Sequence, residues 1–159
     1  MPLQVNLRHL AAHNLRLEGE LPVAELDIDP RDEMIRVERP LAHDLDVQQV
    51  EDGVLVQGRL RLVLECQCVR CLRPFQYAIE LDPWTCLLPL QGEDRVAVVN
   101  DHVDLTPQVR EDILLEFPQH PLCGPDCRGL PKTVIGKAKQ IRQTESSSSA
   151  WAELNKLKF

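Results

Sequence analysis

The sequence has few aromatic residues, no long apolar run and no lysine before Lys132. Aromatic residues make up only 4% of the chain and apolar residues 43%, so a core has to be built mainly from leucine and valine. No apolar run approaches the roughly 18 residues that are needed to cross a bilayer. Residues 1–6 carry no basic region and no apolar block follows them, so we expect no secretory signal. We therefore expect a cytoplasmic protein without a membrane partner.

Motifs of the common enzyme classes are also missing. The sequence contains no phosphate-binding loop, no nucleophile elbow and no HExxH motif. Its five histidines are scattered, and none has an obvious partner nearby in the sequence. These absences predict a protein that is not an enzyme and has no small-molecule substrate.

Charge is distributed unevenly along the chain. Residues 1–127 contain 11 Arg, no Lys and 23 Asp or Glu, a net charge of −12, whereas residues 128–159 have a net charge of +5. An acidic body with a basic tail is typical of proteins that contact a polyanion through the tail. A solvated tail that needs charge only for solubility would have the same composition, so both interpretations stay open.

Alternating apolar and polar residues predict several antiparallel strands. The strongest pattern covers residues 54–67, and weaker ones cover 14–21, 34–50 and 75–82. Pro40 indicates a break within 34–50, and we expect Pro83 to disrupt the last strand. Asp52-Gly53 predicts a hairpin because glycine tolerates the positive φ that such turns require. Gly58 lies on an apolar face and indicates a bulge or a close backbone approach.

One principal helix is predicted at about residues 107–117. Thr106 is the expected N-cap, with Pro107 in the first helical position. Apolar residues spaced by four form a stripe, which Leu114 and Leu115 are expected to widen. The stripe consists of Val109, Ile113 and Phe117.

These patterns together predict an α+β fold. We expect one domain over residues 1–130, formed mainly by an antiparallel β-sheet or a partly open barrel with the one principal helix. A flexible basic C-terminal tail should follow. It would consist of a basic, serine-rich linker over 131–149 and a short amphipathic segment over 150–159.

Six cysteines without an export signal indicate reduced thiols or metal ligands rather than disulfides. Cys68 and Cys71 have the spacing of a metal knuckle, and Cys123 and Cys127 also have a ligand spacing. If the two pairs meet, four thiolates would form a closed structural Zn²⁺ site. Cys66 shares the apolar face of its predicted strand and is expected in the core.

Two other interpretations of the cysteines stay open. The four residues could be small apolar fillers, because free cysteine is often buried, as we expect for Cys86. Cys68 and Cys71 could also form a thiol-redox motif with lowered pKa values. Their position at the end of a strand in an antiparallel pattern disfavours that interpretation, because thioredoxin-like motifs open a helix.

Arginines accompany both cysteine pairs. Arg70 and Arg73 flank the first pair, and Arg128 follows the second. A guanidinium group donates two parallel hydrogen bonds to a phosphate, so clustered arginines would form an RNA-backbone contact site. Surface ion pairs with neighbours such as Asp126 are the alternative. The basic residues of the tail that we expect to contact RNA are Lys132, Lys137, Lys139 and Arg142.

Three segments give the chain its resemblance to a known family. They are Gly58–Phe75 with Cys68-Val69-Arg70-Cys71-Leu72-Arg73-Pro74-Phe75, then Val103–Pro118 with Val103-Asp104-Leu105-Thr106-Pro107, then Pro121-Leu122-Cys123 with Asp126-Cys127-Arg128-Gly129-Leu130. In content, order and approximate spacing they resemble the YceD family, the large ribosomal RNA subunit accumulation proteins. The resemblance implies a non-catalytic role in ribosome biogenesis, in the accumulation or processing of large-subunit (23S) ribosomal RNA. The implied partner is that RNA or a pre-ribosomal particle.

One feature departs from the family pattern. Many members carry further cysteines after the equivalent of Arg128-Gly129-Leu130, whereas here no cysteine follows Cys127. The basic tail could replace that second knuckle as an RNA contact. A protein-binding module is the alternative function, in which the acidic body docks a basic ribosomal protein and residues 151–159 provide an apolar anchor.

Overall fold

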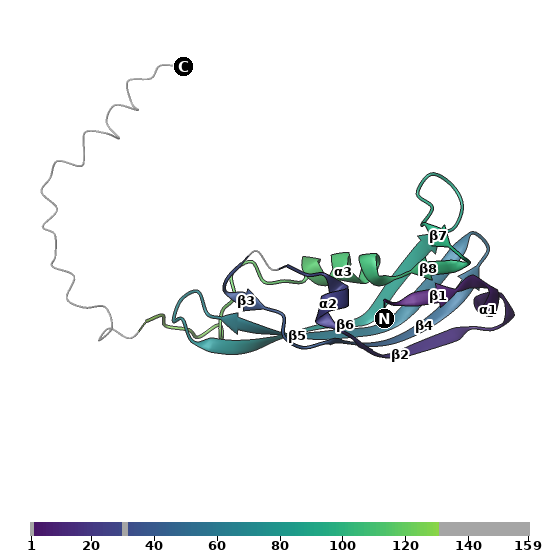
Figure 1. Ribbon diagram of the computed structural model, residues 1–159. Coiled ribbons are helices and arrows are strands. Elements are labelled where there is room, and N and C mark those ends of the chain that lie inside the picture. The colour runs from purple at the N-terminus through teal and green to yellow at the C-terminus, as the bar shows by residue number, and fades with distance from the viewer. Residues whose placement is uncertain (1, 30–31, 131–159) are drawn as a thin grey trace, which may run out of the picture.

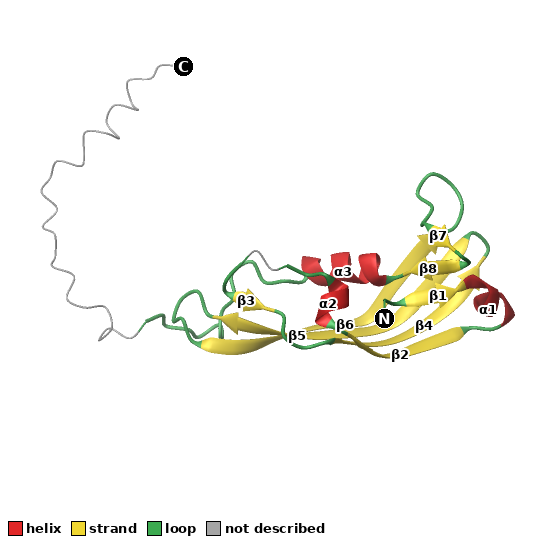
Figure 2. Ribbon diagram, viewed as in Figure 1, coloured by secondary structure: helices red, strands yellow, loops and turns green. Residues whose placement is uncertain are grey.

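The computed structural model describes residues 2–29 and 32–130, and these form a mainly antiparallel β structure with few helices (Figures 1 and 2). A long curved sheet forms a half-barrel, and a small second sheet and the helices cover one of its faces (Figure 1). The predicted α+β class with a partly open barrel is confirmed. No helix within the described ranges is long and apolar enough to span a bilayer.

Both sheets are antiparallel throughout. The large sheet has the order β2-β4-β5-β3, with β6 on the other side of β5. Its strands are β2 (Leu15–Leu21), β3 (Ile35–Arg36), β4 (Leu41–Val50), β5 (Gly53–Gln67) and β6 (Pro74–Pro89). The small sheet consists of β1 (Gln4–Asn6), β8 (His102–Asp104) and β7 (Val98–Val99). The helices are α1 (Leu7–Ala12), α2 (Val23–Leu26) and α3 (Thr106–Leu115).

Strand β5 is the centre of the large sheet, as its alternating pattern predicts. Every second side chain is buried, including Leu60, Leu62 and Leu64, while Arg59 and Arg61 are exposed. The predicted core positions of Cys66 and Cys86 are confirmed, because both are buried in the same core cluster.

The β5–β6 hairpin is longer than the strands beside it. Strand β4 pairs with β5 only between Gly53 and Arg61, and β3 pairs with it only at Glu65 and Cys66. The turn of this hairpin therefore lies at one end of the molecule, beyond the main part of the sheet (Figure 1).

The expected disruption at Pro83 takes the form of an irregularity in pairing with β5, since β6 itself continues through this residue to Pro89. The register changes from Gly58 opposite Trp84 to Leu60 opposite Leu81, so two residues of β6 lie opposite Arg59. This β-bulge contains Pro83, where a missing N–H interrupts no regular ladder. Among the described strands β6 pairs only with β5, and proline is tolerated in such an edge strand.

At two glycine positions of β5, the backbone of a neighbouring strand leaves no room for a side chain. The hairpin predicted at Asp52-Gly53 is present, but Gly53 pairs with Val50 and lacks the expected positive φ. A Cβ atom at Gly53 would instead collide with the carbonyl oxygen of Leu88 on β6. At Gly58 it would collide with the carbonyl oxygen of Asp44 on β4, which confirms the predicted close approach.

Helix α3 packs on the sheet with one narrow face. Val109 and Ile113 are buried as predicted, but Leu114 and Leu115 are 41% and 81% exposed, so the expected widening of the stripe is wrong. At about 100° per residue, Leu115 lies roughly opposite Ile113 around the helix. Trp84 Nε1 on β6 donates a hydrogen bond of 2.7 Å to Asp112 and so ties α3 to the large sheet.

Thr106 was the predicted N-cap of α3, but it does not occupy that position. It is the first helical residue, and Leu105 occupies the cap position. Asp104 Oδ1 accepts a hydrogen bond from the Thr106 N–H at 2.9 Å and so satisfies a free donor at the helix start. The Thr106 hydroxyl is buried and accepts a hydrogen bond from Leu3 N, which fixes the N-terminal segment.

Candidate functional site

The first cysteine pair lies in the turn between β5 and β6. Cys68 N donates to Arg73 O and Leu72 N donates to Cys68 O, each at 2.9 Å, so the turn is closed by its own backbone. Leu72 has a φ of 62°, in the left-handed region. This tight conformation places Cys68 and Cys71 on one side of the turn. We call residues 67–74 and 119–130 together the cysteine tip.

The second cysteine pair is brought to this turn by the segment after α3. That segment runs back along the molecule toward the β5–β6 turn (Figure 1). Val69 N donates a hydrogen bond of 2.9 Å to Pro121 O, two residues before Cys123. Cys127 N donates to Gly124 O at 3.2 Å, which closes a second turn between the two cysteines.

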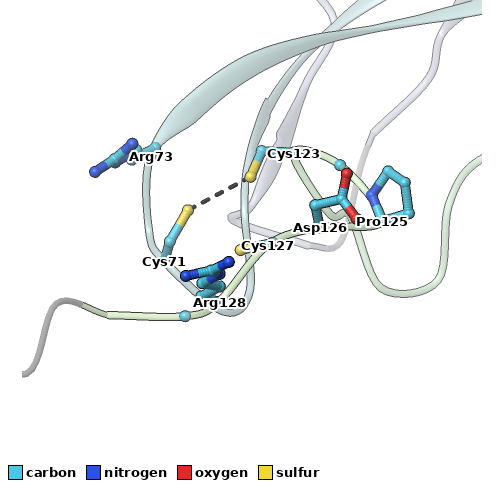
Figure 3. Close-up of a pocket in the computed structure, with 9 residues that line it drawn as sticks. Cys71, Arg73, Cys123, Pro125, Asp126, Cys127 and Arg128 are labelled. Carbon is cyan, nitrogen blue, oxygen red and sulfur yellow. Dashed lines mark hydrogen bonds between the residues drawn. The ribbon is translucent and has the colours of Figure 1, made fainter.

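The two pairs meet, which fulfils the condition for a site of four thiolates. The four sulfur atoms all lie within 4.8 Å of one another. Cys68 Sγ lies 3.6 Å from Cys127 Sγ, and Cys71 Sγ lies 3.6 Å from Cys123 Sγ. Figure 3 shows the sulfurs of Cys71, Cys123 and Cys127 pointing toward one another. Cys68 is buried and Cys123 is exposed, so the cluster extends from the protein interior to its surface.

The sulfur positions are compatible with a metal ion. A tetrahedral site with Zn–S bonds of about 2.3 Å requires sulfurs about 3.8 Å apart. The observed sulfur–sulfur distances, from 3.6 Å up to at most 4.8 Å, are close to that value. Four thiolates form a closed donor set that leaves no coordination position for a substrate. The residues therefore fit a structural site rather than a catalytic one.

The cluster shifts the pKa values of two of its thiols in opposite directions. Burial acts to raise the pKa of Cys68, but backbone N–H groups of Cys71, Cys123 and Arg70 outweigh it and lower the pKa to about 6. Hydrogen bonds with the Cys127 and Cys71 sulfurs, followed by burial, raise the pKa of Cys123 to about 12. The cluster thus favours the thiolate of Cys68 and opposes that of Cys123. A bound cation would remove that opposition, because metal ligation stabilises every thiolate.

The alternative interpretations of the cysteines fit the structure less well. Cys123 is exposed, so it is not an apolar filler. The Cys68–Cys71 motif connects two strands of a hairpin, whereas a thioredoxin-like motif precedes a helix. The lowered pKa of Cys68 is a feature of redox cysteines, but its sulfur is buried rather than accessible.

The predicted arginine cluster surrounds these sulfurs. Arg73 and Arg128 line an open depression of about 370 Å³, together with three of the cysteines. Arg70 is exposed on the same turn, and its carbonyl oxygen lies next to Gly129. Among the described residues none of these arginines forms an ion pair, and Asp126 lies on the opposite side of the sulfurs from Arg73 (Figure 3).

The remaining predicted contact residues lie outside the described part of the chain. They are Lys132, Lys137, Lys139 and Arg142. The linker over 131–149 and the amphipathic segment over 150–159 also lie there.

The sequence analysis missed two features of the cysteine tip. One is the backbone N–H groups that act on Cys68, for which a sequence carries no signal because they depend on turn conformation. The other is a set of exposed apolar side chains beside the arginines. Their exposure could not be predicted, because isolated leucines and valines in loops form no sequence pattern that separates exposed from buried side chains. They are Val69, Leu72, Leu122 and Leu130.

Comparison with known proteins places the chain among relatives of undetermined function. It is 31% identical over 134 residues to uncharacterized proteins of Mycobacterium bovis and Mycobacterium tuberculosis, which covers 77% of this chain and 65% of theirs. It is also 30% identical over 99 residues to an uncharacterized protein of Mycobacterium leprae, covering 57% of this chain and 46% of that one. The chain therefore spans less than two thirds of the length of these relatives. No solved structure gives a significant match.

A family match covers more than half of the chain. Residues 56–158 match the family described as "Large ribosomal RNA subunit accumulation protein YceD", and this range includes most of β5 and all of β6, α3 and both cysteine pairs. The resemblance seen in the three sequence segments is thereby confirmed. Since the matched residues contain the whole cysteine tip and the elements that position it, the chain belongs to the YceD family.

Proposed function

We propose that this protein is a non-catalytic cytoplasmic factor that promotes accumulation or processing of large-subunit ribosomal RNA. It would do so by binding that RNA, or a pre-ribosomal particle, through the cysteine tip. The description of the family supports the role. The observation that carries the placement is a group of exposed arginines, which form no ion pair within the described part of the chain, around four clustered sulfurs.

Cys68, Cys71, Cys123 and Cys127 are proposed to hold one structural Zn²⁺ ion. The ion would tie the β5–β6 turn to the segment after α3 and supply the positive charge that four thiolates require. Elemental analysis of protein purified without chelator should find about one zinc per chain. A chain that retains its fold with all four thiols reactive and no metal would contradict this assignment.

Arg70, Arg73 and Arg128 are proposed to contact RNA phosphates. Each guanidinium can donate two hydrogen bonds to one phosphate, and none is engaged by a carboxylate within the described residues. The basic tail residues would add phosphate contacts. These are Lys132, Lys137, Lys139 and Arg142.

Salt dependence tests the arginine contacts. The logarithm of the affinity for a large-subunit RNA fragment should fall linearly with the logarithm of the salt concentration. The slope should be about −0.7 for each phosphate contact to a single strand. The double variant Arg73→Ala/Arg128→Ala should reduce the magnitude of that slope by about 1.4. Arg95→Ala is the matched control, because Arg95 is equally exposed but lies between β6 and β7. Equal losses in both variants would reject a specific contact at the tip.

A deletion tests the tail separately. Removing residues 131–159 should weaken RNA binding and reduce its salt slope further. Affinity that is unchanged by the deletion would contradict the tail contacts and leave those of the tip standing. Sedimentation with ribosomal particles followed by RNA crosslinking would then identify the RNA site.

A protein-binding module is the second candidate function. It is favoured by the acidity of residues 1–127, whose net charge of −12 would attract a basic ribosomal protein. Pull-down after nuclease treatment separates the two functions. A ribosomal protein retained without RNA would support the second candidate, whereas loss of all partners would support direct RNA binding.

A further inference from the structure

Exposed apolar side chains gather at the cysteine tip. Val69, Leu72, Leu122 and Leu130 are 38%, 44%, 36% and 37% exposed. The hydrogen bond from Val69 N to Pro121 O brings the first turn against the segment that contains Leu122. Gly129 lies beside the Arg70 carbonyl, so Leu130 also belongs to this surface. Aliphatic side chains therefore lie on the same turns as guanidinium groups that form no ion pair among the described residues.

The arginines of the tip differ from those of the sheet. On β2 and β5, Arg16 and Arg59 lie 2.9 and 3.3 Å from Asp44, and both are engaged in an ion pair with it. Arg73 and Arg128 line the depression, which Asp126 also lines, but among the described residues neither arginine forms an ion pair. Their planar groups are free to bind a phosphate or to stack on a base.

Resting on the proposed RNA role, we propose that the cysteine tip binds unpaired nucleotides of single-stranded RNA in preference to duplex RNA. Unpaired bases present apolar faces that pack on side chains and stack on guanidinium planes. Val69, Leu72 and Leu122 would contact such faces, while the arginines bind the flanking phosphates. None of these three side chains lines the depression of about 370 Å³, in which Arg73 and Arg128 would bind the phosphates.

Duplex RNA fits this surface poorly for two reasons. Its bases are stacked and paired, so exposed leucines would face charged backbone and gain nothing from it. Domains that recognise the duplex contact about 16 base pairs along one face. Here the tip is the narrow end of the molecule (Figure 1), and the acidic body behind it would repel a long rigid polyanion.

Fluorescence anisotropy with the full-length protein tests the preference. The probes are a labelled single strand of about 12 nucleotides and the same strand annealed to its complement, at one fixed salt concentration. The single strand should bind about tenfold more tightly. Leu72→Asn should weaken single-strand binding about fivefold and leave duplex binding nearly unchanged. Asparagine suits this site because it tolerates the positive φ of 62° at Leu72.

Leu115→Asn is the matched control, because Leu115 is an exposed leucine on α3 outside the tip. It should leave both affinities unchanged, and the metal content of each variant verifies that the tip remains folded. Equal or tighter duplex binding by the parent protein would overturn this inference while leaving RNA binding intact. Equal losses in Leu72→Asn and Leu115→Asn would overturn it as well. Binding of neither probe, with a protein partner retained after nuclease treatment, would overturn the proposed RNA function itself.

Discussion

The β-sheet body and the cysteine tip are stabilised in different ways. In the body, side chains of β4, β5 and β6 are fully buried in one continuous core, and their burial supplies the stabilisation. In the tip only Cys68 and Pro121 are buried, and four leucine and valine side chains are exposed. Residues 67–74 and 119–130 bury too little apolar surface to hold together alone. Small structures of this kind usually depend on a metal or a disulfide.

The comparison teaches where function can change without loss of the fold. A closed core tolerates little alteration because close packing is sensitive to a single methylene group. The tip contains exposed cations and apolar groups on two turns joined by one cluster.

Removal of one of the four clustered sulfurs should have the largest effect, and that effect should appear in the cysteine tip and not in the β-sheet body. Cys68→Ala should reduce the zinc content from about one per chain to near zero, since structural zinc contributes about 10–16 kcal/mol in small domains. Hydrogen exchange should rise in residues 67–74 and 119–130 and remain slow in β4 and β5. Elemental analysis and exchange mass spectrometry measure both.

Cys66→Ala is the control for that experiment. Cys66 is also buried but belongs to the core cluster, so its variant should keep the metal and lose only about 1 kcal/mol of stability. If both variants lost metal equally, the division between body and tip would be wrong.

A core truncation should affect the body alone. Leu62 is fully buried on β5, so Leu62→Ala should lower the free energy of unfolding by about 2–5 kcal/mol. Zinc content should not change in the folded protein. Urea unfolding measures the loss, and Val63→Ala on the half-buried opposite face of β5 should cost much less. Similar costs at the two positions would mean that β5 is not the centre of the core.

Substitution of a glycine should distinguish the packed body from the open tip. Gly58→Ala places a Cβ against the β4 backbone, so unfolding should become easier by about 1–3 kcal/mol. Gly124, between the tip cysteines, has no neighbour within 4 Å of such a Cβ, and Gly124→Ala should change stability by less than about 0.5 kcal/mol. Chemical unfolding of both variants measures this, and the reverse order would contradict the register of β4 and β5.

The pH dependence of the body should show the smallest effect. Burial lowers the pKa of His43 below its ordinary value of 6.5, so the folded state favours the neutral ring. The unfolded chain binds more protons as pH falls through about 6.5, so stability is full above that pH and decreases below it. His43→Gln should flatten this decrease. Unfolding curves at pH 7.5 and 5.5 test this prediction. If the parent protein and His43→Gln lost the same free energy of unfolding between these pH values, His43 would be excluded as the cause.

Much of the fold followed from local pattern. The period-two alternation over residues 54–67 predicted β5 and its buried face, because that face must leave water whatever the rest of the chain does. The same pattern placed Cys66 in the core. Helix α3 was predicted from its spacing of four, although Leu114 and Leu115 are exposed because only one narrow face contacts the sheet.

The differences from expectation arose where a neighbouring strand decided the outcome. Pro83 ends a strand by its local chemistry, but a bulge opposite Arg59 accommodates it in β6. Gly53 suggested a positive φ, whereas the approach of β6 is what excludes a side chain there. At these two positions, local residue types did not determine the strand register or the contacts between strands.

The amino-acid sequence alone determined the class of the fold, the two metal-ligand spacings and the acidic character of the body, because these depend on residue type and local period. Only the tertiary structure decided that the cysteine pairs meet, that the arginines of the tip form no ion pair with residues 2–29 and 32–130, and that leucines of the tip are exposed. Each of these features depends on the path by which the segment after α3 returns to the β5–β6 turn. That path is set by the packing of α3 on the sheet and by the hydrogen bond from Val69 to Pro121, both contacts between residues far apart in the chain.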